Sequence, residues 1–207
     1  MSELTENLAS FDRKLGIRKH QLCLNQSSAA LSYLESHHIK LSVAIDFEWG
    51  YWQEQNVLTI PQYTVSGEPI ALKVRYLENK GFQYETGFKK SNYLYGFHKA
   101  REAAWSCSDV IIVEGEADVL SLHSRGYRNC VALSGTDLNE YRMALILTLS
   151  NKICLFLDGD KAGKLATERI TNQMKQVFGN SIDIKSVECE GSDPSECSDE
   201  QLKELLC

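Results

Sequence analysis

Four short apolar runs in the second half of the chain alternate with segments of helical pattern, and this alternation constrains the fold most. The runs are residues 109–113, 130–135, 153–157 and 182–187, and the helical segments are 117–125, 138–149, 162–178 and 198–206. Strands without apolar–polar alternation are typical of a parallel sheet that helices cover on both faces. We therefore predict an α/β fold for residues 109–207, with a ligand crevice at the carboxyl ends of its strands.

Three acidic clusters follow three of these predicted strands. Residues 114–118 (EGEAD) follow the first strand, residues 158–160 (DGD) the third and residues 191–196 (GSDPSE) the fourth. A buried strand avoids charge unless that charge is paired or bound to a metal. Because neighbouring parallel strands lie about 4.8 Å apart, carboxylates at their ends can share a divalent cation.

Hard oxygen ligands of this kind suit Mg²⁺, which takes one or two carboxylates together with substrate phosphates. Asp158 and Asp160 point the same way if the chain stays extended, toward one metal or toward the two metals common in phosphoryl transfer. Each cluster alone is also compatible with a turn or with a helix N-terminus that favours negative charge. The occurrence of three clusters at the ends of one predicted sheet favours the cation.

The first half of the chain has a different pattern. Residues 1 to about 55 show helical spacing, with a cap at Ser27 or Ser28. Residues 57–63, 69–77 and 81–88 are short β-rich runs separated by the turn signals VSGE and ENKG, which predict a small antiparallel meander. We therefore expect three parts: an N-terminal helical arm (1–26), an α+β subdomain (27–108) and the parallel-sheet domain (109–207).

Charge is unevenly distributed along the chain. The net charge of −6 argues against a protein that coats nucleic acid without specificity. However, residues 68–101 contain seven basic and three acidic side chains, whereas residues 191–207 contain five acids and one lysine. This pattern is compatible with a polyanion and metal ions that meet at one cleft, or with a solvated surface on which charges cluster at random.

The seven cysteines form no C-x-x-C pair and have no nearby histidine partner, so we expect no zinc site. We expect free thiols throughout, with Cys130 and Cys154 buried in strands. No apolar run approaches the roughly 20 residues that span a bilayer, and the polar start is no signal peptide. These features predict a cytoplasmic protein without a membrane partner.

Residues 110–138 (VIIVEGEADVLSLHSRGYRNCVALSGTDL) and 153–170 (ICLFLDGDKAGKLATERI) closely resemble the TOPRIM domain shared by DnaG-type primases, topoisomerases and some nucleases. The resemblance implies a parallel sheet of four strands with flanking helices. It also implies that Glu114 is a metal ligand or general acid/base, and that Asp158 and Asp160 are the metal-binding aspartate pair. Asp118 matches a further acidic position, and Asp193 resembles the later acidic loop of primases. The predicted metal ligands are therefore Glu114, Asp118, Asp158, Asp160 and Asp193, of which Glu114, Asp158 and Asp160 are the predicted catalytic residues.

Upstream, residues 60–77 (IPQYTVSGEPIALKVRYL) and 92–100 (NYLYGFHKA) are similar to the amino-terminal half of primase catalytic cores. The versions in phage primase–helicases look closest. On this resemblance, residues 27–108 are the N-terminal subdomain of a primase core. The basic residues expected to face template or nucleotide phosphates are Lys73 and Arg75, followed by Lys89, Lys90 and Lys161. For each lysine, a solvated surface position is the alternative.

The resemblance implies a DNA-directed RNA polymerase of the primase type, which makes short RNA primers on single-stranded DNA from ribonucleoside triphosphates. Its expected cofactor is Mg²⁺, with Mn²⁺ as the alternative. Primases of this type usually carry an N-terminal zinc module, which this sequence lacks, so a replicative helicase or a zinc-bearing subunit is the expected partner. The alternatives are a TOPRIM nuclease and a nucleic-acid-binding or regulatory subunit of a replication or defence complex. A topoisomerase is disfavoured, because 207 residues leave no room for its further domains.

Overall fold

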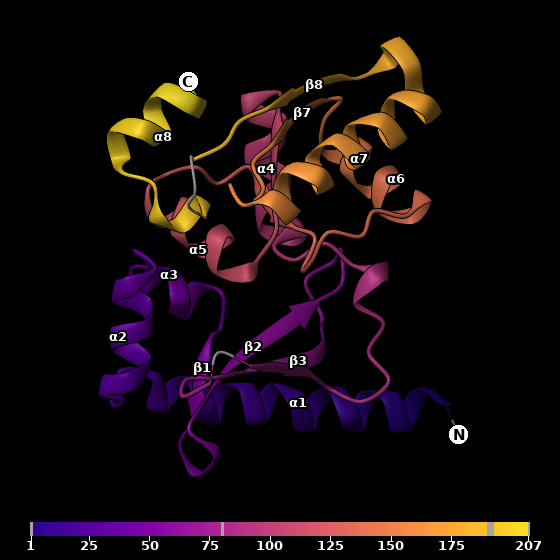
Figure 1. Ribbon diagram of the computed structural model, residues 1–207. Coiled ribbons are helices and arrows are strands. Elements are labelled where there is room, and N and C mark those ends of the chain that lie inside the picture. The colour runs from indigo at the N-terminus through magenta and orange to yellow at the C-terminus, as the bar shows by residue number, and fades with distance from the viewer. Residues whose placement is uncertain (1, 80, 190–192, 207) are drawn as a thin grey trace. The chain divides into compact units, whose positions relative to one another are not determined.

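The computed structural model describes residues 2–79, 81–189 and 193–206, with side chains from residue 12 onward. Lys80, one of the seven basic residues counted above, lies outside the described residues, as do Gly191 and Ser192 of the third acidic cluster and Cys207. The chain divides into two compact units, residues 1–88 and residues 89–207. Figure 1 shows the elements of each unit.

The first unit combines helices with an antiparallel sheet. Its helices are α1 (Ser2–Leu24), α2 (Ser28–Ser36) and α3 (Leu41–Asp46), and its strands are β1 (Gly50–Trp52), β2 (Val57–Tyr63), β3 (Pro69–Tyr76) and β4 (Phe82–Tyr84). The strands pair antiparallel in the order β1-β2-β3-β4, which confirms the predicted meander. The prediction of helix up to about residue 55 is wrong from Gly50 onward, because β1 pairs there with β2.

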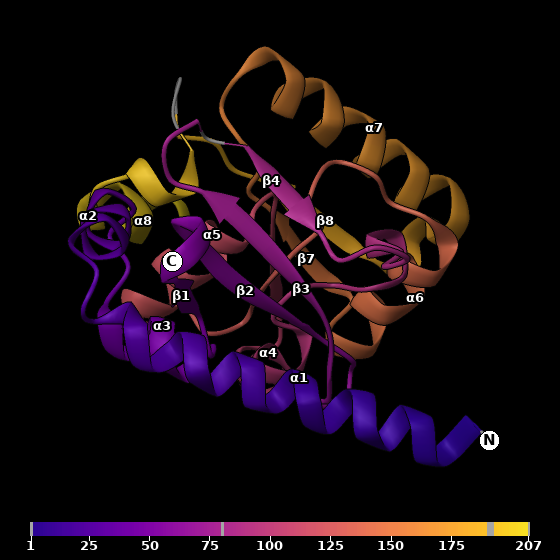
Figure 2. The same ribbon diagram turned by 90° about the horizontal axis from the view of Figure 1, so that it is seen from below.

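Two local features position the helices of the first unit: a side-chain cap at the start of α2 and a close contact between α1 and β1. The Ser27 hydroxyl caps α2 by accepting a hydrogen bond from the Ala30 N–H at 3.2 Å, as predicted. Helix α1 packs against β1 and β3, and Figure 2 shows it running along this sheet. A Cβ atom at Gly50 would lie 2.6 Å from Cβ of His20. Glycine is therefore required where β1 meets α1.

The second unit is an α/β sandwich. Its helices are α4 (Phe97–Cys107), α5 (Glu116–Ser124), α6 (Glu140–Leu149), α7 (Lys161–Phe178) and α8 (Asp199–Leu206), and its strands are β5 (Val110–Val113), β6 (Cys130–Ala132), β7 (Lys152–Leu155) and β8 (Asp183–Ser186). The strands are parallel and lie in the order β6-β5-β7-β8. The predicted four-stranded parallel sheet with flanking helices is thus confirmed.

Both faces of this sheet are buried. One face contributes alternate residues such as Val110, Ile112 and Leu155 to a core that also contains residues of α4, α6 and α7. The intervening residues Ile111 and Val113 face the other side, where α5 packs against β6. Strand β8 at the edge is largely exposed. This layering leaves the carboxyl ends of the inner strands as the place where polar groups gather.

The division between the units falls before Lys89, whereas the pattern of the sequence predicted a boundary after residue 108. Arg142 of α6 is 1% exposed and donates hydrogen bonds to the carbonyl oxygens of Lys90 (2.6 Å), Tyr93 (3.0 Å) and Asp137 (2.6 Å). Helix α4 contributes to the core of the second unit. These contacts join residues 89–107 to the parallel-sheet unit, while α1 packs within the first unit rather than forming an arm of its own.

The cysteines depart from expectation at one pair. Cys130 and Cys154 are buried free thiols, as predicted. Cys189 and Cys197 instead form a disulfide, with their Cα atoms 6.2 Å apart. The prediction of free thiols throughout is therefore wrong for these two, because the fold places the two residues close enough to bond.

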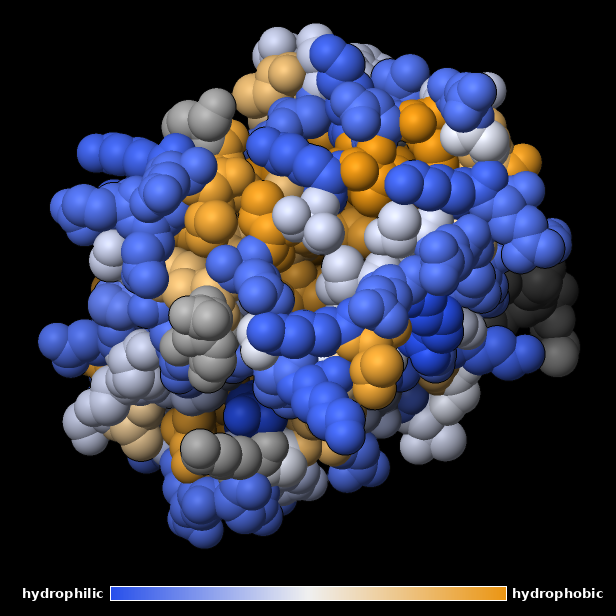
Figure 3. All heavy atoms as spheres, turned by 45° about the horizontal axis from the view of Figure 1, so that its top comes forward, coloured by the Kyte–Doolittle hydropathy of each residue, from blue (hydrophilic) through white to orange (hydrophobic). Residues whose placement is uncertain are grey.

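Polar side chains dominate the molecular face drawn in Figure 3, where they surround a smaller group of apolar side chains. In the described part of the chain, no helix is long and apolar enough to cross a membrane.

Candidate active site

Two neighbouring parallel strands bring Glu114 and Asp158 to the same edge of the sheet. Strands β5 and β7 pair with Ile112 opposite Leu155, so the segments that follow them leave the sheet side by side. Glu114 directly follows β5, and Asp158 ends the buried run that continues β7. Sheet topology alone therefore gathers two of the predicted acids.

Asp158 is a strongly perturbed carboxyl group of this cluster. Burial raises its pKa to about 8, and the negative charges of Asp118, Asp193, Glu114 and Asp160 add to the effect. Among the residues that the structure describes, its buried Oδ1 atom has no hydrogen-bond partner. A carboxylate that is desolvated, repelled by its neighbours and unpartnered is stabilised by a cation.

Two other acids share this environment. The Asp118 side chain is 6% exposed, and its Oδ2 accepts a hydrogen bond from the Gly115 N–H at 3.1 Å. Burial raises the pKa of Asp118 to about 7, since burial and the charge of Asp193 outweigh the hydrogen bonds from Gly115 and Ser195. Burial also raises the pKa of Glu114, with Asp160 and Asp193 adding to the shift and Lys90 opposing it. Asp158 is thus the group on which the other four predicted acids all act.

Asp160, a predicted metal ligand, also caps a helix. Its Oδ1 caps α7 by accepting a hydrogen bond from the Gly163 N–H at 2.7 Å. A Cβ atom at Gly163 would lie 2.0 Å from the carbonyl oxygen of Asp158, so the first turn of α7 can approach the DGD segment only with glycine there. Gly163 was not among the predicted site residues, although a glycine inside a helix was the available signal.

Lys90 is a predicted basic residue that the structure brings to the acids. Its Nζ donates a hydrogen bond to the carbonyl oxygen of Ser134 at 2.8 Å, and it lies 3.1 Å from a Cβ built at Gly135. The Gly135 N–H donates to the carbonyl oxygen of Glu114 at 3.2 Å. The Ser134 hydroxyl donates to Glu116, a buried acid that the sequence analysis did not single out, at 2.8 Å. The end of β6 thus supports both Glu114 and Lys90.

The remaining predicted basic residues have varied surroundings. Lys73 of β3 is 8% exposed, and its Nζ lies 4.4 Å from the ring centre of Phe82 and 5.2 Å from that of Tyr84. Arg75, on the same strand, is half-buried. Lys89 and Lys161 are exposed, and Lys161 is the first residue of α7 beside Asp160. A phosphate-binding role for these residues stays a prediction.

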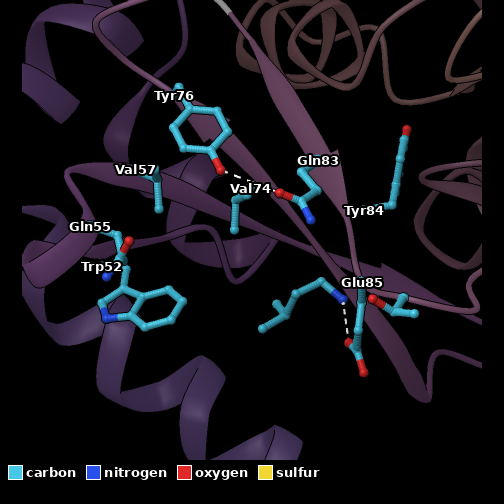
Figure 4. Close-up of a pocket in the computed structure, with 10 residues that line it drawn as sticks. Trp52, Gln55, Val57, Val74, Tyr76, Gln83, Tyr84 and Glu85 are labelled. Carbon is cyan, nitrogen blue, oxygen red and sulfur yellow. Dashed lines mark hydrogen bonds between the residues drawn. The ribbon is translucent and has the colours of Figure 1, made fainter.

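A cavity of about 390 Å³ opens on the antiparallel sheet of the first unit. Its lining includes Trp52, Tyr76 and Tyr84, together with the amide side chains of Gln55 and Gln83. Figure 4 shows Trp52 and Gln55 on one side and Gln83 and Tyr84 on the other. The Tyr76 hydroxyl donates to Oε1 of Gln83 at 3.4 Å, so the polar groups of the lining are partly ordered already.

The residues present fit a divalent cation by their chemistry. The acids offer hard oxygen donors, and the unpartnered Oδ1 of Asp158 and the mutual repulsion of the carboxylates both favour positive charge. Over residues 12–79, 81–189 and 193–206, no group of three or more Asp, Glu, His or Cys side chains is already arranged as a metal site. The magnesium site therefore stays a prediction, and the acids would have to draw together to form it.

Comparison with known proteins narrows the class. Residues 108–188 match the family model described as the Toprim domain. The DNA primase of Helicobacter pylori is 35% identical over 114 residues, which are 53% of this chain and 20% of that protein. The DNA primase of Borreliella burgdorferi is 33% identical over 144 residues, which are 67% of this chain and 27% of that protein. The chain thus spans well under a third of the length of these relatives.

Solved structures extend the likeness to both units. The zinc-binding and RNA polymerase domains of the Aquifex aeolicus primase match with a TM-score of 0.78 and 25% identity, over 99% of this chain and 59% of that one. The RNA polymerase domain of the Mycobacterium tuberculosis primase DnaG matches with a TM-score of 0.80 over 100% of this chain and 84% of that one. At 20% identity, the second match shows the fold alone. Residues 108–188 thus match the Toprim domain, and the chain resembles the catalytic core of DnaG-type DNA primases, as its motifs predicted.

Proposed function

We propose that this chain is the core of a primase-type nucleotidyltransferase, which joins ribonucleotides into short RNA primers on single-stranded DNA in the cytoplasm. The observation that carries the proposal is that the neighbouring strands β5 and β7 of a Toprim fold end at Glu114 and Asp158, and that the charges of Glu114, Asp118, Asp160 and Asp193 all act on Asp158. Primase relatives and primase-core structures support the choice of polymerisation over other Toprim chemistry.

In this proposal the acids hold two Mg²⁺ ions, with Glu114, Asp158 and Asp160 as the principal ligands and Asp118 and Asp193 in support. When bound, Mg²⁺ supplies charge stabilisation for the reacting phosphates and the leaving pyrophosphate. Lys90 contributes a fixed positive charge beside Glu114, and Lys89 and Lys161 are candidates for phosphate contacts. Asp160 also fixes the start of α7, so its carboxylate is oriented before any ligand arrives.

For the template, the structure of a DnaG primase catalytic domain with bound single-stranded DNA supports a similar ligand here. We propose that the cavity of the first unit takes bases of a single strand, because Trp52, Tyr76 and Tyr84 offer ring faces and Gln55 and Gln83 offer amide groups. Replacing Trp52 with alanine should then weaken oligonucleotide binding roughly fivefold to a hundredfold, as the loss of one stacked base predicts. A replicative helicase or a zinc-bearing subunit completes the proposed set of partners.

Incorporation of labelled ribonucleotides on single-stranded DNA in Mg²⁺ tests the activity. The variant Asp158→Asn with Asp160→Asn should lose primer synthesis by more than about a hundredfold and keep its fold, since asparagine still caps α7. The matched control is Glu168→Gln with Asp183→Asn, which removes two exposed acids of the same unit. Primer synthesis by the first variant at the level of the control would reject the site.

The same reactions separate the alternatives. A nuclease would shorten the labelled DNA strand in Mg²⁺ without incorporating ribonucleotides. A binding or regulatory subunit would bind the oligonucleotide without shortening it and without incorporating ribonucleotides.

A further inference from the structure

The segment that carries Asp193 is tied down at two places. We call residues 193–197, which include the short 3-10 helix at Pro194–Glu196, the acid loop. The Arg125 guanidinium at the end of α5 donates one hydrogen bond to the carbonyl oxygen of Ser195 at 2.7 Å and another to that of Cys197 at 2.6 Å. The Arg125 side chain is 9% exposed, so these bonds are shielded from water. This arginine is the first tie.

The second tie is covalent. Cys197 at the end of the acid loop is bonded to Cys189, which follows β8. Cys189 is 6% exposed and Cys197 is 1% exposed, whereas the free Cys107 is exposed. The disulfide therefore joins the acid loop to the segment that follows the edge strand β8.

The acid loop interacts with the acids of the candidate metal centre. The negative charge of Asp193 acts on Glu114, Asp118 and Asp158, and Ser195 donates hydrogen bonds to the Asp118 carboxylate. A movement of the loop would therefore change both the charge at the centre and the hydrogen bonding of one of its acids. Closing a short loop by a covalent bond removes conformational freedom that would otherwise have to be lost when a ligand binds.

We propose that the Cys189–Cys197 disulfide is a redox-sensitive positioning device: oxidised, it holds Asp193 at the metal centre, and reduction releases the acid loop and weakens divalent-cation binding. The inference rests on the proposed function, since it takes the clustered acids to bind a cation. Arg125 is the positioning residue that remains after reduction, so binding weakens but is not lost.

The redox step is ordinary thiol–disulfide exchange. One thiolate of a dithiol reductant attacks one sulfur of the pair, and the S–S bond breaks as a mixed disulfide forms. The second thiol of the reductant then attacks the reductant's own sulfur in the mixed disulfide and displaces the protein sulfur that was attacked first. Two electrons pass to the protein, its two sulfurs take up two protons, and the reductant leaves as a disulfide. A low-molecular-weight disulfide drives the reverse reaction and is itself reduced to two thiols.

The test measures Mn²⁺ binding by the full chain in both redox states. Protein is oxidised with a low-molecular-weight disulfide or reduced with a dithiol, the reagent is removed under anaerobic conditions, and free Mn²⁺ is counted by electron paramagnetic resonance. Oxidised protein should bind Mn²⁺ on the order of fivefold more tightly than reduced protein. Cys189→Ser with Cys197→Ser should bind like reduced protein under both treatments, whereas the control Cys107→Ser should respond like the unmodified chain.

Equal affinity in the two states would overturn the redox inference and leave the proposed function standing. A failure of both states to bind Mn²⁺ would overturn the proposed function and the inference together. Arg125→Lys separates positioning from general stability, because lysine keeps the charge but cannot make both hydrogen bonds. It should enlarge the redox effect on Mn²⁺ affinity, with Arg128→Lys as the exposed control. An unchanged redox effect would contradict the role of Arg125 as the first tie.

Discussion

The two units of the molecule position polar side chains by different means. In the second unit, β5 and β7 are parallel neighbours that end at the same edge, so Glu114 and Asp158 meet although they are far apart in the chain. In the first unit, the antiparallel register places Lys73 opposite Tyr84, and the lysine packs against aromatic rings. In the parallel sheet, charged side chains therefore gather where neighbouring strands end. In the antiparallel sheet, the charged side chain packs against a residue of the neighbouring strand.

The largest expected effect on stability comes from Gly163, the glycine that lets α7 start close to the DGD segment in the second unit. Gly163→Ala puts a Cβ atom 2.0 Å from the carbonyl oxygen of Asp158, so α7 must shift away from the DGD segment. We expect urea denaturation to give a free energy of unfolding lower by about 3 kcal/mol or more.

Gly16→Ala in α1 of the first unit is the matched control for Gly163→Ala. A Cβ atom at Gly16 would meet nothing within 4 Å. Alanine there should raise the free energy of unfolding by roughly 0.5–1 kcal/mol, because glycine in a helix is entropically costly. Equal responses to the two substitutions would show that the close approach at Gly163 has no energetic consequence.

A comparable loss is expected at the buried arginine that joins residues 89–93 to the second unit. Arg142→Met leaves the carbonyl oxygens of Lys90, Tyr93 and Asp137 without this donor, which should cost about 3 kcal/mol in urea denaturation. Arg169→Met is the control, since this exposed arginine donates to the carbonyl oxygen of Thr136 at the surface. It should cost less than about 1 kcal/mol, and an equally large loss would contradict the importance of burial.

The crowded acids should have a smaller effect on stability. Removing one of their charges should stabilise the protein, whereas the substitutions at Gly163 and Arg142 should destabilise it. The pKa of Asp158 is raised to about 8 in the folded protein, against about 3.9 in an unfolded chain. The folded state therefore binds this proton more tightly, and the melting temperature of metal-free protein should fall as the pH rises from about 4 to about 8. Asp118, with a pKa raised to about 7, contributes in the same direction.

Asp158→Asn should remove part of this pH dependence. The variant should melt a few degrees above the unmodified protein at pH 8, and the difference should shrink toward pH 4, where the carboxyl group is neutral in both states. Differential scanning calorimetry in a chelator provides the measurement. A lower melting temperature at pH 8 would mean that the charges are not in conflict.

The smallest expected effect on stability is that of replacing Lys73 in the first unit. Lys73→Met keeps most of the side-chain volume but loses the charge over Phe82 and Tyr84, so stability should fall by about 1 kcal/mol. Because the rings enclose the ammonium group, the salt dependence of single-stranded DNA binding should stay the same. A decrease of the log–log slope by about 0.7 would instead indicate a phosphate contact at Lys73.

The sequence predicted the second unit well for a physical reason. Runs such as residues 109–113 and 153–157 are apolar because both faces of the sheet are covered, and the acids that follow them converge by topology alone. The same logic gave the meander of the first unit but overlooked β1, whose three residues lie in a region of mixed pattern.

What the sequence did not disclose depends on contacts between distant segments. The support of Lys90 by Ser134, the anchoring of residues 89–93 by Arg142 and the Cys189–Cys197 bond join parts of the chain whose spacing carries no signal. Gly163 was visible in the motif, but its role depends on how closely α7 approaches Asp158. Packing, rather than pattern, decides these features.

The central claim is that acids from separate strand ends form one cation site, and calorimetric titration with Mg²⁺ at pH 7 tests it most directly. Because the pKa of Asp158 is raised to about 8, this carboxyl group is protonated in most molecules at pH 7. Cation binding should therefore release about one proton per protein molecule. The account predicts a binding heat that changes with the ionisation enthalpy of the buffer, and its loss in Asp158→Asn. Absence of Mg²⁺ binding, or equal binding by Asp158→Asn, would contradict it.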